Sequence, residues 1–423
     1  MKHSPIPLFA ADILLPDFSR TDAESWAVVA CDQFTSEPAY WEAADAMVGK
    51  KPSTLRMILP EVYLEKGDAR IPHIHTSMTE HLKSVLCSHP DSMIYLERTQ
   101  SDGRVRRGII GMVDLECYDY QKGSASLIRA TEGTVLERIP PRVAVRRGAS
   151  LELPHVMLLI DDPERTVIEP LIRPCASRKA VYDFDLMQES GHVRGCFLTR
   201  EEIEALQAAL ADLITPGAMQ KRYADGSLAP LLFAVGDGNH SLASAKAYYE
   251  EIKASVGAEA AREHPARYAL CEVVNLHDDA LSFEPIYRVV FDCDPDALLA
   301  DLQTYAASLR GNAPAQALLC VREAEDTVLP IPTPEQQLTV GTLQAFLDLY
   351  QKAHPSITVD YIHGEDSLRT LAARPNTIGF LFDGMRKDEL FKTVLFDGAL
   401  PRKTFSMGHA KDKRHYLECR RIL

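Results

Sequence analysis

One six-residue segment, Gly236-Asp237-Gly238-Asn239-His240-Ser241, gathers side chains that can do chemistry. Asp237 can act as a general base or as a ligand for Mg²⁺. His240 can transfer a proton or bind a phosphate oxygen, and Asn239 stands between these two residues. We interpret Asp237, Asn239 and His240 as candidate catalytic residues. The alternative that the sequence leaves open is a strand–turn–helix junction in which the Asn and His serve only as caps.

The glycines of this segment favour a backbone that approaches a ligand closely. Gly236 and Gly238 permit tight or left-handed conformations. A helix that begins here presents unpaired N–H groups that attract phosphate or carboxylate, with Ser241 as a candidate N-cap. We therefore predict that Gly236, Gly238 and Ser241 bind substrate or phosphate. The P-loop pattern Gly-x-x-x-x-Gly-Lys-Ser/Thr does not occur, and the dinucleotide pattern Gly-x-Gly-x-x-Gly is not matched because position 241 is serine.

A second candidate region is the polar segment Arg129-Ala130-Thr131-Glu132-Gly133-Thr134. The guanidinium fork matches the geometry of phosphate and carboxylate, so an arginine here indicates anion capture. We predict that Arg129, Thr131 and Glu132 bind the anionic part of a substrate. The arginines that follow are equally compatible with anion binding and with a solvated, ion-paired surface: Arg138, Arg142, Arg146 and Arg147.

Two further segments can contribute to the same pocket. The last 23 residues hold seven Lys or Arg against two acids. We predict that this tail folds back and that His409, Lys411 and Arg414 bind substrate, while a solvated basic tail is the alternative. Cys31–Ser36 follows a short apolar run, and we predict that Asp32 lines the pocket.

Apolar runs of strand length alternate with helical patterns along the chain. A buried strand over 231–235 precedes the Gly-rich turn, and a helix over 242–253 follows it. Further strands are predicted at 27–31 and 156–160, a hairpin at 92–98 and 107–115, and an amphipathic helix at 200–213. The capping-box spacing of Ser77 to Glu80 predicts that a helix begins there.

This alternation predicts an α/β fold with mixed sheets and flanking helices. The turn-like segment 292–296 marks a boundary near residue 295. We expect a larger core over 1–295 that carries the turn, a smaller C-terminal β/α subdomain over 296–400, and the basic tail over 401–423.

The formal net charge of −14 argues against nucleic-acid and anionic membrane partners. The N-terminal residues lack a signal-peptide pattern, and no apolar stretch reaches about 18 residues. The nine cysteines contain no Cys-x-x-Cys pair and fit a reducing compartment. These observations predict a cytoplasmic protein whose ligand is a small anionic metabolite. The oligomeric state is left open.

Taken together, the motifs resemble the domain-of-unknown-function 1015 family over nearly the whole chain. The resemblance rests on the segments 28–36, 52–61, 107–110, 129–132, 236–241, 284–288 and the basic C-terminus. The turn also resembles that of the ParB/sulfiredoxin group, which includes free-serine kinases. The commoner family form is Asp-Gly-His-His-Arg, so Asn239 and Ser241 stand here in place of His and Arg. That resemblance implies phosphate chemistry at the turn, with Arg129 or the tail supplying the missing cation.

The first functional hypothesis is therefore phosphoryl transfer or phosphate-ester hydrolysis on a small metabolite such as serine or phosphoserine. Mg²⁺, with Asp237 as a ligand, and a nucleotide are the expected cofactors. Kinase and phosphatase remain open at this point. The alternative is a regulator without chemistry that binds an anionic metabolite in the same pocket.

Overall fold

A computed structural model describes residues 6–134, 136–323 and 325–423 of the chain. Two compact units are present. The first contains the described residues up to Leu281 together with His409–Leu423, and the second is Ser282–Gly408. The predicted α/β class with mixed sheets is confirmed. The second unit begins at Ser282 rather than near residue 295, and the chain returns to the first unit at His409.

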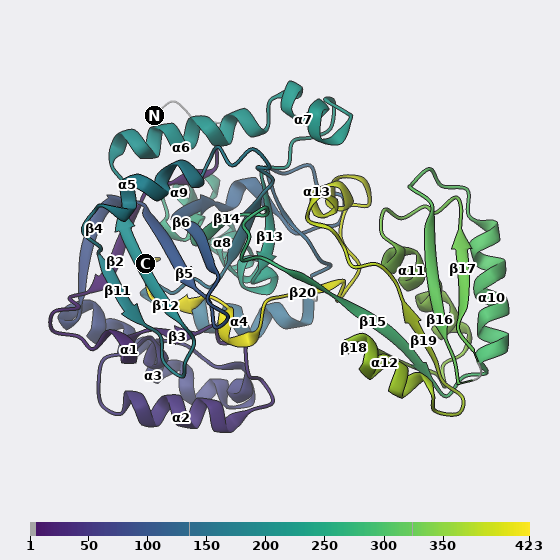
Figure 1. Cartoon of the computed structure of the whole chain (residues 1–423). Helices are drawn as coiled ribbons and strands as arrows, with labels where there is room; N and C mark the ends of the chain where they lie inside the picture. The colour runs from purple at the N-terminus through teal and green to yellow at the C-terminus, as the bar shows by residue number, and fades with distance from the viewer. Residues whose placement is uncertain (1–5, 135, 324) are drawn as a thin grey trace. The chain divides into compact units, whose positions relative to one another are not determined.

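In the described part of the first unit, ten strands form one mixed sheet (Figure 1). The parallel pairs are β10 with β14, β13 with β8 and β7 with β8, and the other pairs are antiparallel. Along the sheet, the strands are β11 (Tyr182–Asp185), β12 (His192–Phe197), β5 (Ile94–Thr99), β6 (Val105–Asp114), β14 (Tyr268–Asn275), β10 (Met157–Ile160), β13 (Phe233–Asp237), β8 (Ile128–Ala130) and β7 (Tyr118–Asp119), with β1 (Leu8–Phe9) beside β6.

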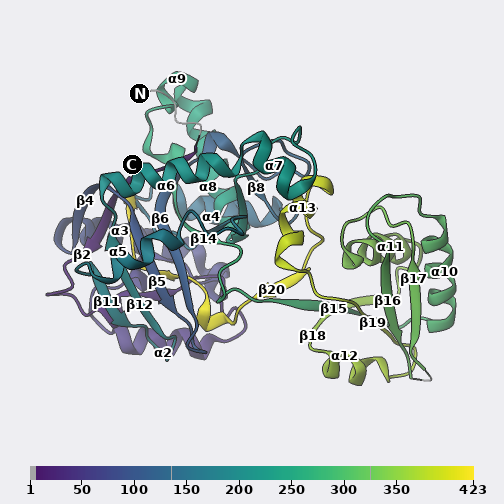
Figure 2. The same ribbon diagram turned by 45° about the horizontal axis from the view of Figure 1, so that its top comes forward.

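Helices cover both faces of this sheet. Successive β5 side chains point to opposite faces, so Tyr95 joins one apolar cluster while Ile94 and Leu96 join another. The first cluster includes α6, and the second includes α3 and α4; Figures 1 and 2 show α6 and α3 on opposite sides of the sheet. The helices are α1 (Ala23–Trp26), α2 (Pro38–Val48), α3 (Gly67–Ser84), α4 (Ile139–Arg146), α5 (Ile172–Ala176), α6 (Arg200–Leu213), α7 (Pro216–Tyr223), α8 (Asn239–Val256) and α9 (Ala258–Ala261).

The described residues of the first unit also form three small antiparallel ribbons, and two of these contain the tail. The strand β21 (His415–Tyr416) pairs with β3 (Val28–Val29), and β22 (Arg420–Arg421) pairs with β9 (Leu151–Glu152). The third ribbon joins β2 (Ala11–Pro16) to β4 (Leu86–Ser92). The tail is therefore held by backbone hydrogen bonds to segments that lie more than 250 positions earlier in the sequence.

The second unit has its own sheet, in the order β17-β16-β19-β15-β18, with β20 also paired to β15. The strands are β15 (Phe283–Phe291), β16 (Gln316–Val321), β17 (Thr327–Ile331), β18 (Thr358–His363), β19 (Ile378–Leu381) and β20 (Phe405–Met407). The helices are α10 (Pro295–Ser308), α11 (Thr339–Ala353), α12 (Glu365–Ala372) and α13 (Lys387–Phe396).

One predicted helix start is wrong. The helix α3 begins at Gly67, ten residues before Ser77, and ends at Ser84. The supposed capping box lies inside the helix, where the Ser77 carbonyl accepts a hydrogen bond from His81 Nδ1 (2.7 Å). Ile74 and Met78, four positions apart, are buried on one helix face. Burial of this face therefore extends the helix beyond the capping signal.

Candidate functional site

The Gly-rich turn joins β13 directly to α8. Gly236 is required by close packing, because a Cβ atom there would lie 2.8 Å from the Leu159 side chain on β10. Gly238 is the N-cap of α8 and has a φ of 81°, which is the left-handed region that glycine adopts most easily. The Asp237 carboxylate accepts a hydrogen bond from the Gly238 amide (3.1 Å). The two glycines thus place Asp237 at the very start of the helix.

Sheet topology brings two other segments to the turn. Because β8 runs parallel to β13, Thr131 emerges at the same edge of the sheet as Asp237. Because β10 runs antiparallel to β13, His155 lies just before the end of β10 that meets Asp237, whose register partner is Met157. The turn, Thr131 and His155 therefore converge on one edge of the sheet.

Thr131 and Asn239 tie the turn to β8. The Thr131 hydroxyl donates to the Val235 carbonyl (2.6 Å), and the Thr131 amide donates to Asn239 Oδ1 (3.3 Å). The Asn239 amide nitrogen is 3.4 Å from the Thr131 hydroxyl. These contacts fix the first residue of α8, so Asn239 is here a residue that positions the turn.

The tail places a cation against the turn. Lys413 Nζ lies 3.3 Å from Asp237 Oδ2, and both side chains are about one-sixth exposed. The pairing of β21 with β3 sets this position, because Lys413 precedes β21 and Asp32 follows β3. Burial raises the pKa of Asp32, but His155, Gln33 and Lys413 outweigh that effect and leave the pKa below its ordinary value. Two carboxylates, Asp32 and Asp237, therefore flank one lysine.

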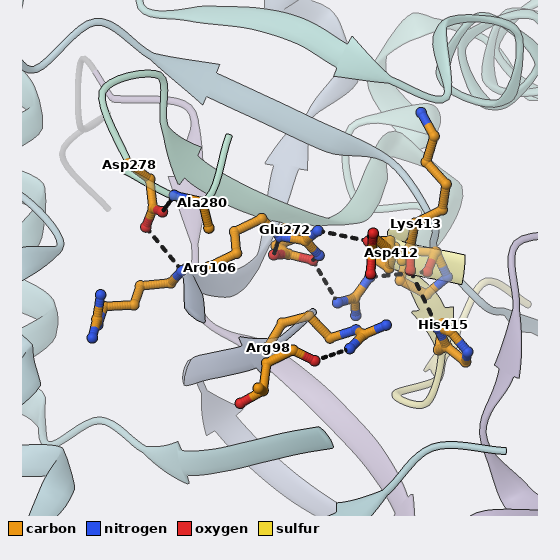
Figure 3. Close-up of polar contacts among 12 residues, drawn as sticks. Arg98, Arg106, Glu272, Asp278, Ala280, Asp412, Lys413 and His415 are labelled. Atoms are coloured by element: carbon orange, nitrogen blue, oxygen red, sulfur yellow. Dashed lines mark hydrogen bonds and ion pairs between the residues drawn. The ribbon is translucent and has the colours of Figure 1, made fainter. Parts of the chain in front are cut away.

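Buried ion pairs behind Lys413 hold the tail in place (Figure 3). Glu272 on β14 pairs with Arg106 on β6 (3.1 Å) and with Arg414 (2.9 Å), and all three side chains are at most 4% exposed. Arg98 donates to the Lys411 carbonyl (2.9 Å). In Figure 3, the Lys413 side chain extends away from Arg98 and Arg106. Arg414 and Lys413 thus point in different directions, one into the core and the other to the turn.

His240 is kept neutral by its surroundings. Burial lowers its pKa to about 4, with further lowering by the nearby cations Arg142 and Arg138. A histidine with this pKa is uncharged near pH 7 and can donate one hydrogen bond and accept another. Arg142 forms an ion pair with Glu61, so the cation near His240 is already partly balanced.

The turn also carries a hydroxyl–imidazole pair. Ser241 Oγ is 3.0 Å from His155 Nε2, and Asp32 Oδ2 is 3.8 Å from the same nitrogen. His155 Nδ1 is 2.7 Å from the Tyr416 hydroxyl on β21. Ser241 thus contributes its side chain to a polar chain that runs from the turn to the tail.

Arg129 lies on β8, the neighbour of β13, but its side chain does not reach the turn. Its guanidinium donates to the carbonyls of Ser126 (2.8 Å), Ala229 (2.9 Å) and Pro230 (3.2 Å). These partners lie before the parallel strands β8 and β13, at the edge opposite to Asp237. Arg129 therefore holds the connection into β13 rather than the turn after it.

The remaining predicted residues lie in different surroundings. Glu132 is half-buried next to Thr131. His409 is exposed, and Lys411 contributes its backbone carbonyl to Arg98. Arg414 is enclosed by Glu272, Glu418 and the Pro154 carbonyl.

Lys413 and His155 were missed by the sequence-based predictions. Lys413 was one of several tail cations, and no local pattern distinguishes it from Lys411. His155 directly precedes a predicted strand, and the antiparallel pairing of that strand with β13 would have identified it. The missing information is therefore the order and direction of strands.

The carboxylates of the site do not form a preformed metal cage. Within the described residues, no group of three or more His, Cys, Asp or Glu side chains is arranged to hold a metal ion. Mg²⁺ is commonly bound by one or two carboxylates together with substrate phosphates, and Asp237 and Asp32 fit this kind of ligand set. In the same described parts of the chain, no helix combines the length and apolar character needed to cross a membrane.

Comparison with known proteins identifies the family. The model of the family described as "Protein of unknown function (DUF1015)" matches residues 17–358, and the chain belongs to this family. No curated protein matches the sequence significantly.

Several solved structures are similar at low identity. A conserved hypothetical protein from Pyrococcus furiosus has 10% identity and a TM-score of 0.34, with coverage of 71% of this chain and 90% of that one. A free serine kinase mutant in complex with AMP has 11% identity and a TM-score of 0.38, with coverage of 74% and 92%. SbnI with a C-terminal truncation, from Staphylococcus aureus, has 9% identity and a TM-score of 0.33, with coverage of 71% and 82%. These values are too low to assign a ligand or an activity to the chain.

Proposed function

We propose that this DUF1015 protein transfers or removes a phosphoryl group on a small metabolite, such as serine or phosphoserine, at the turn between β13 and α8. The observation that carries the proposal is the pair Asp237–Lys413, 3.3 Å apart, at the N-terminus of α8. A carboxylate that can accept a proton and a cation that can hold an anion thus meet at a helix end that favours negative charge.

The start of α8 supplies donors for a phosphate. The amide of Leu242 is the first to bond back, to the Gly238 carbonyl (3.0 Å), so the amides of Asn239, His240 and Ser241 precede the regular ladder. The N-cap of α8 is Gly238, which has no side chain to accept a hydrogen bond from these amides. Backbone N–H groups in this arrangement bind phosphate in many proteins.

Lys413 supplies the charge that the turn lacks. The turn that this segment resembles ends in Arg, where this chain has Ser241. Lys413 reaches the same turn from the tail, and the ion pairs of Arg414 fix the backbone next to it. A phosphate oxygen can replace the Asp237 carboxylate as the partner of Lys413, which would release Asp237 for proton transfer.

Each side chain then has a defined role. Asp237 accepts the proton of the attacking hydroxyl or water, while Lys413 holds the transferred phosphoryl oxygens. The neutral His240 contributes a hydrogen bond rather than a positive charge. When bound together with a nucleotide, Mg²⁺ would offset the phosphate charge, with Asp32 as a protein ligand; Asp237 is a ligand only in the alternative in which it does not act as the base.

The test begins with thermal unfolding of the purified protein in the presence of ADP, ATP, phosphoserine and sugar phosphates, each with and without Mg²⁺. A ligand at about 100 times its Kd stabilises the folded state by about 2.7 kcal/mol. The same ligand is then assayed for phosphoryl transfer or phosphate release. Asp237→Asn is expected to abolish turnover while the protein remains folded, and the exposed control Asp212→Asn retains it. Full turnover in Asp237→Asn would falsify the assignment.

Binding without turnover would point to the second candidate, a regulator that holds an anionic metabolite. The pairing of Asp237 with Lys413 supports this second candidate, because the lysine already occupies the carboxylate that an enzyme would need as its base. A ligand recovered unchanged after prolonged incubation, with binding that still depends on Lys413, distinguishes the regulator from the enzyme.

A further inference from the structure

An apolar cavity lies on the inner side of the turn, within the first unit. Its volume is about 130 Å³, and its lining includes Met57, Leu59, Met78, Val145, Leu242 and Leu270. Ser241, His155, Tyr416 and Cys31 form a polar group in its wall. Two ion pairs, Arg142 with Glu61 and Arg146 with Glu152, complete the lining. The cavity thus combines a mainly apolar surface with one hydroxyl–imidazole pair.

Both ring nitrogens of His155 have a hydrogen-bond partner. Nδ1 is 2.7 Å from the Tyr416 hydroxyl, which also lies 3.0 Å from Cys31 Sγ. In the neutral tautomer with the proton on Nδ1, this N–H donates to Tyr416, and Nε2 accepts from the Ser241 hydroxyl (3.0 Å). The arrangement is that of a serine with an adjacent, oriented general base.

We propose that Ser241 is a nucleophile that accepts the acyl group of an ester of an apolar carboxylic acid, with His155 as its general base. Two features beyond the pair support this assignment. His155 is 4% exposed and is held from both nitrogens, so its orientation is fixed before a ligand arrives. Most of the neighbouring wall is apolar, and its charged side chains are paired with one another, Arg142 with Glu61 and Arg146 with Glu152, so the wall can bury the acyl chain next to the reacting carbonyl.

The chemistry balances with water as the only co-reactant. Ser241 Oγ attacks the ester carbonyl carbon, and its proton moves to His155 Nε2. The tetrahedral intermediate expels the alkoxide, which takes that proton and leaves as an alcohol, and Ser241 remains acylated. Water then attacks the acyl carbon, gives a proton to Nε2, and releases the carboxylic acid as Ser241 Oγ is protonated again.

Cys31 is the competing nucleophile in this wall, and its surroundings disfavour it. Burial and the charge of Asp32 raise the pKa of the Cys31 thiol to about 12, so the thiolate is scarce near pH 7. Tyr416 acts as a positioning residue, because it contacts His155 and not the reacting atoms.

The direct test is labelling of the full-length protein by an alkyl fluorophosphonate, read by intact mass. One adduct per chain is expected on wild type. Ser241→Ala and His155→Ala are expected to lose it, whereas Ser244→Ala, which alters a second serine of the same cavity, retains it. Absence of labelling in wild type, or an adduct that persists in Ser241→Ala, would overturn the proposal.

A second test uses p-nitrophenyl esters of increasing acyl length and keeps the proposal falsifiable if a variant misfolds. Burial of each methylene is worth a factor of about four, so kcat/KM is expected to rise about four-fold per carbon from acetyl to butyryl. Tyr416→Phe removes the hydroxyl that contacts His155 Nδ1 and is expected to shift the pH dependence of labelling as well as its rate. A kcat/KM that does not depend on acyl length contradicts the role of the cavity, and an unchanged pH profile contradicts that of Tyr416.

Discussion

Charged side chains lie at the centre of the first unit, whereas apolar packing dominates the second. Glu272, Arg106 and Arg414 are all at most 4% exposed, and each contacts another segment of the first unit. In the described part of the second unit, Arg288 is the one buried charged side chain, and its Nε donates to Gln344 (2.9 Å). Apolar packing stabilises the sheet of the second unit. In the first unit, the tail that brings Lys413 to Asp237 is held by ion pairs and hydrogen bonds as well. Buried charge is thus concentrated beside the tail, whose Lys413 is far from Asp237 in the sequence but contacts it in the candidate site.

The largest effect is expected from Glu272→Ala. This change leaves Arg106 and Arg414 buried without their shared partner, and breaking a buried pair costs about 3–5 kcal/mol. Urea unfolding measures the loss. Glu204→Ala breaks an exposed ion pair with Arg200 and is expected to cost about 0.5 kcal/mol or less. Equal losses for the two variants would show that the buried network does not stabilise the first unit.

A change in the second unit tests the other half of the comparison. Leu343 on α11 is fully buried, so Leu343→Ala is expected to cost about 2–5 kcal/mol through lost packing and a residual cavity. Urea unfolding should show this loss with little change in ligand affinity at the turn. A large loss of affinity in a variant that is still folded would contradict the placement of the site wholly in the first unit.

The pH dependence of stability provides a third test. Burial, then Arg98 and other cations, lower the pKa of His415 well below its ordinary value. The unfolded chain therefore binds a proton below about pH 6.5, while the folded chain does not until the pH is much lower. Stability from the neutral ring is present above about pH 6.5 and is lost as the pH falls toward the folded pKa. In His415→Gln, this decline should be weaker between pH 6.5 and 5; identical slopes would be inconsistent with a buried neutral His415.

A smaller effect is expected at Gly238. A left-handed residue other than glycine costs about 1–2 kcal/mol, and a new Cβ would lie 3.1 Å from the Val156 backbone. Gly238→Ala is therefore expected to lower thermal stability modestly and to weaken ligand binding, because the start of α8 must shift. Gly257→Ala is the control: φ is 87° there, but no atom lies within 4 Å of the new Cβ. A similar loss of binding in both variants would contradict a specific role for the turn.

Local patterns predicted much of the fold. The helix over 200–213 matches α6, because a capping box, Thr199 with Glu202, coincides with one apolar face. The turn was found because two glycines, an acid and a His follow an apolar strand. The central strand β14 was not predicted, since Tyr268–Asn275 is buried on both faces and lacks an alternating pattern.

The site was harder to predict than the fold, because its composition depends on long-range pairing. Sequence placed Arg129 and Arg414 among the anion-binding candidates, but the structure engages both in internal hydrogen bonds or ion pairs. Lys413, next to Arg414, faces Asp237 only because β21 pairs with β3. A charged residue in a sequence does not reveal whether its partner is a ligand or another part of the chain.

The most direct test of the central claim is calorimetric titration of Mg·ADP into wild type, Lys413→Met and Lys221→Met. Lys221 is an exposed lysine on α7 that pairs with Glu164, so its replacement serves as the matched control. Loss of a charge-assisted contact of about 1.5–3 kcal/mol predicts that Lys413→Met raises Kd about ten-fold or more. The Kd of Lys221→Met should equal that of wild type. The same Kd in all three proteins, or no binding to wild type, would contradict a nucleotide-phosphate site formed by the turn and the tail.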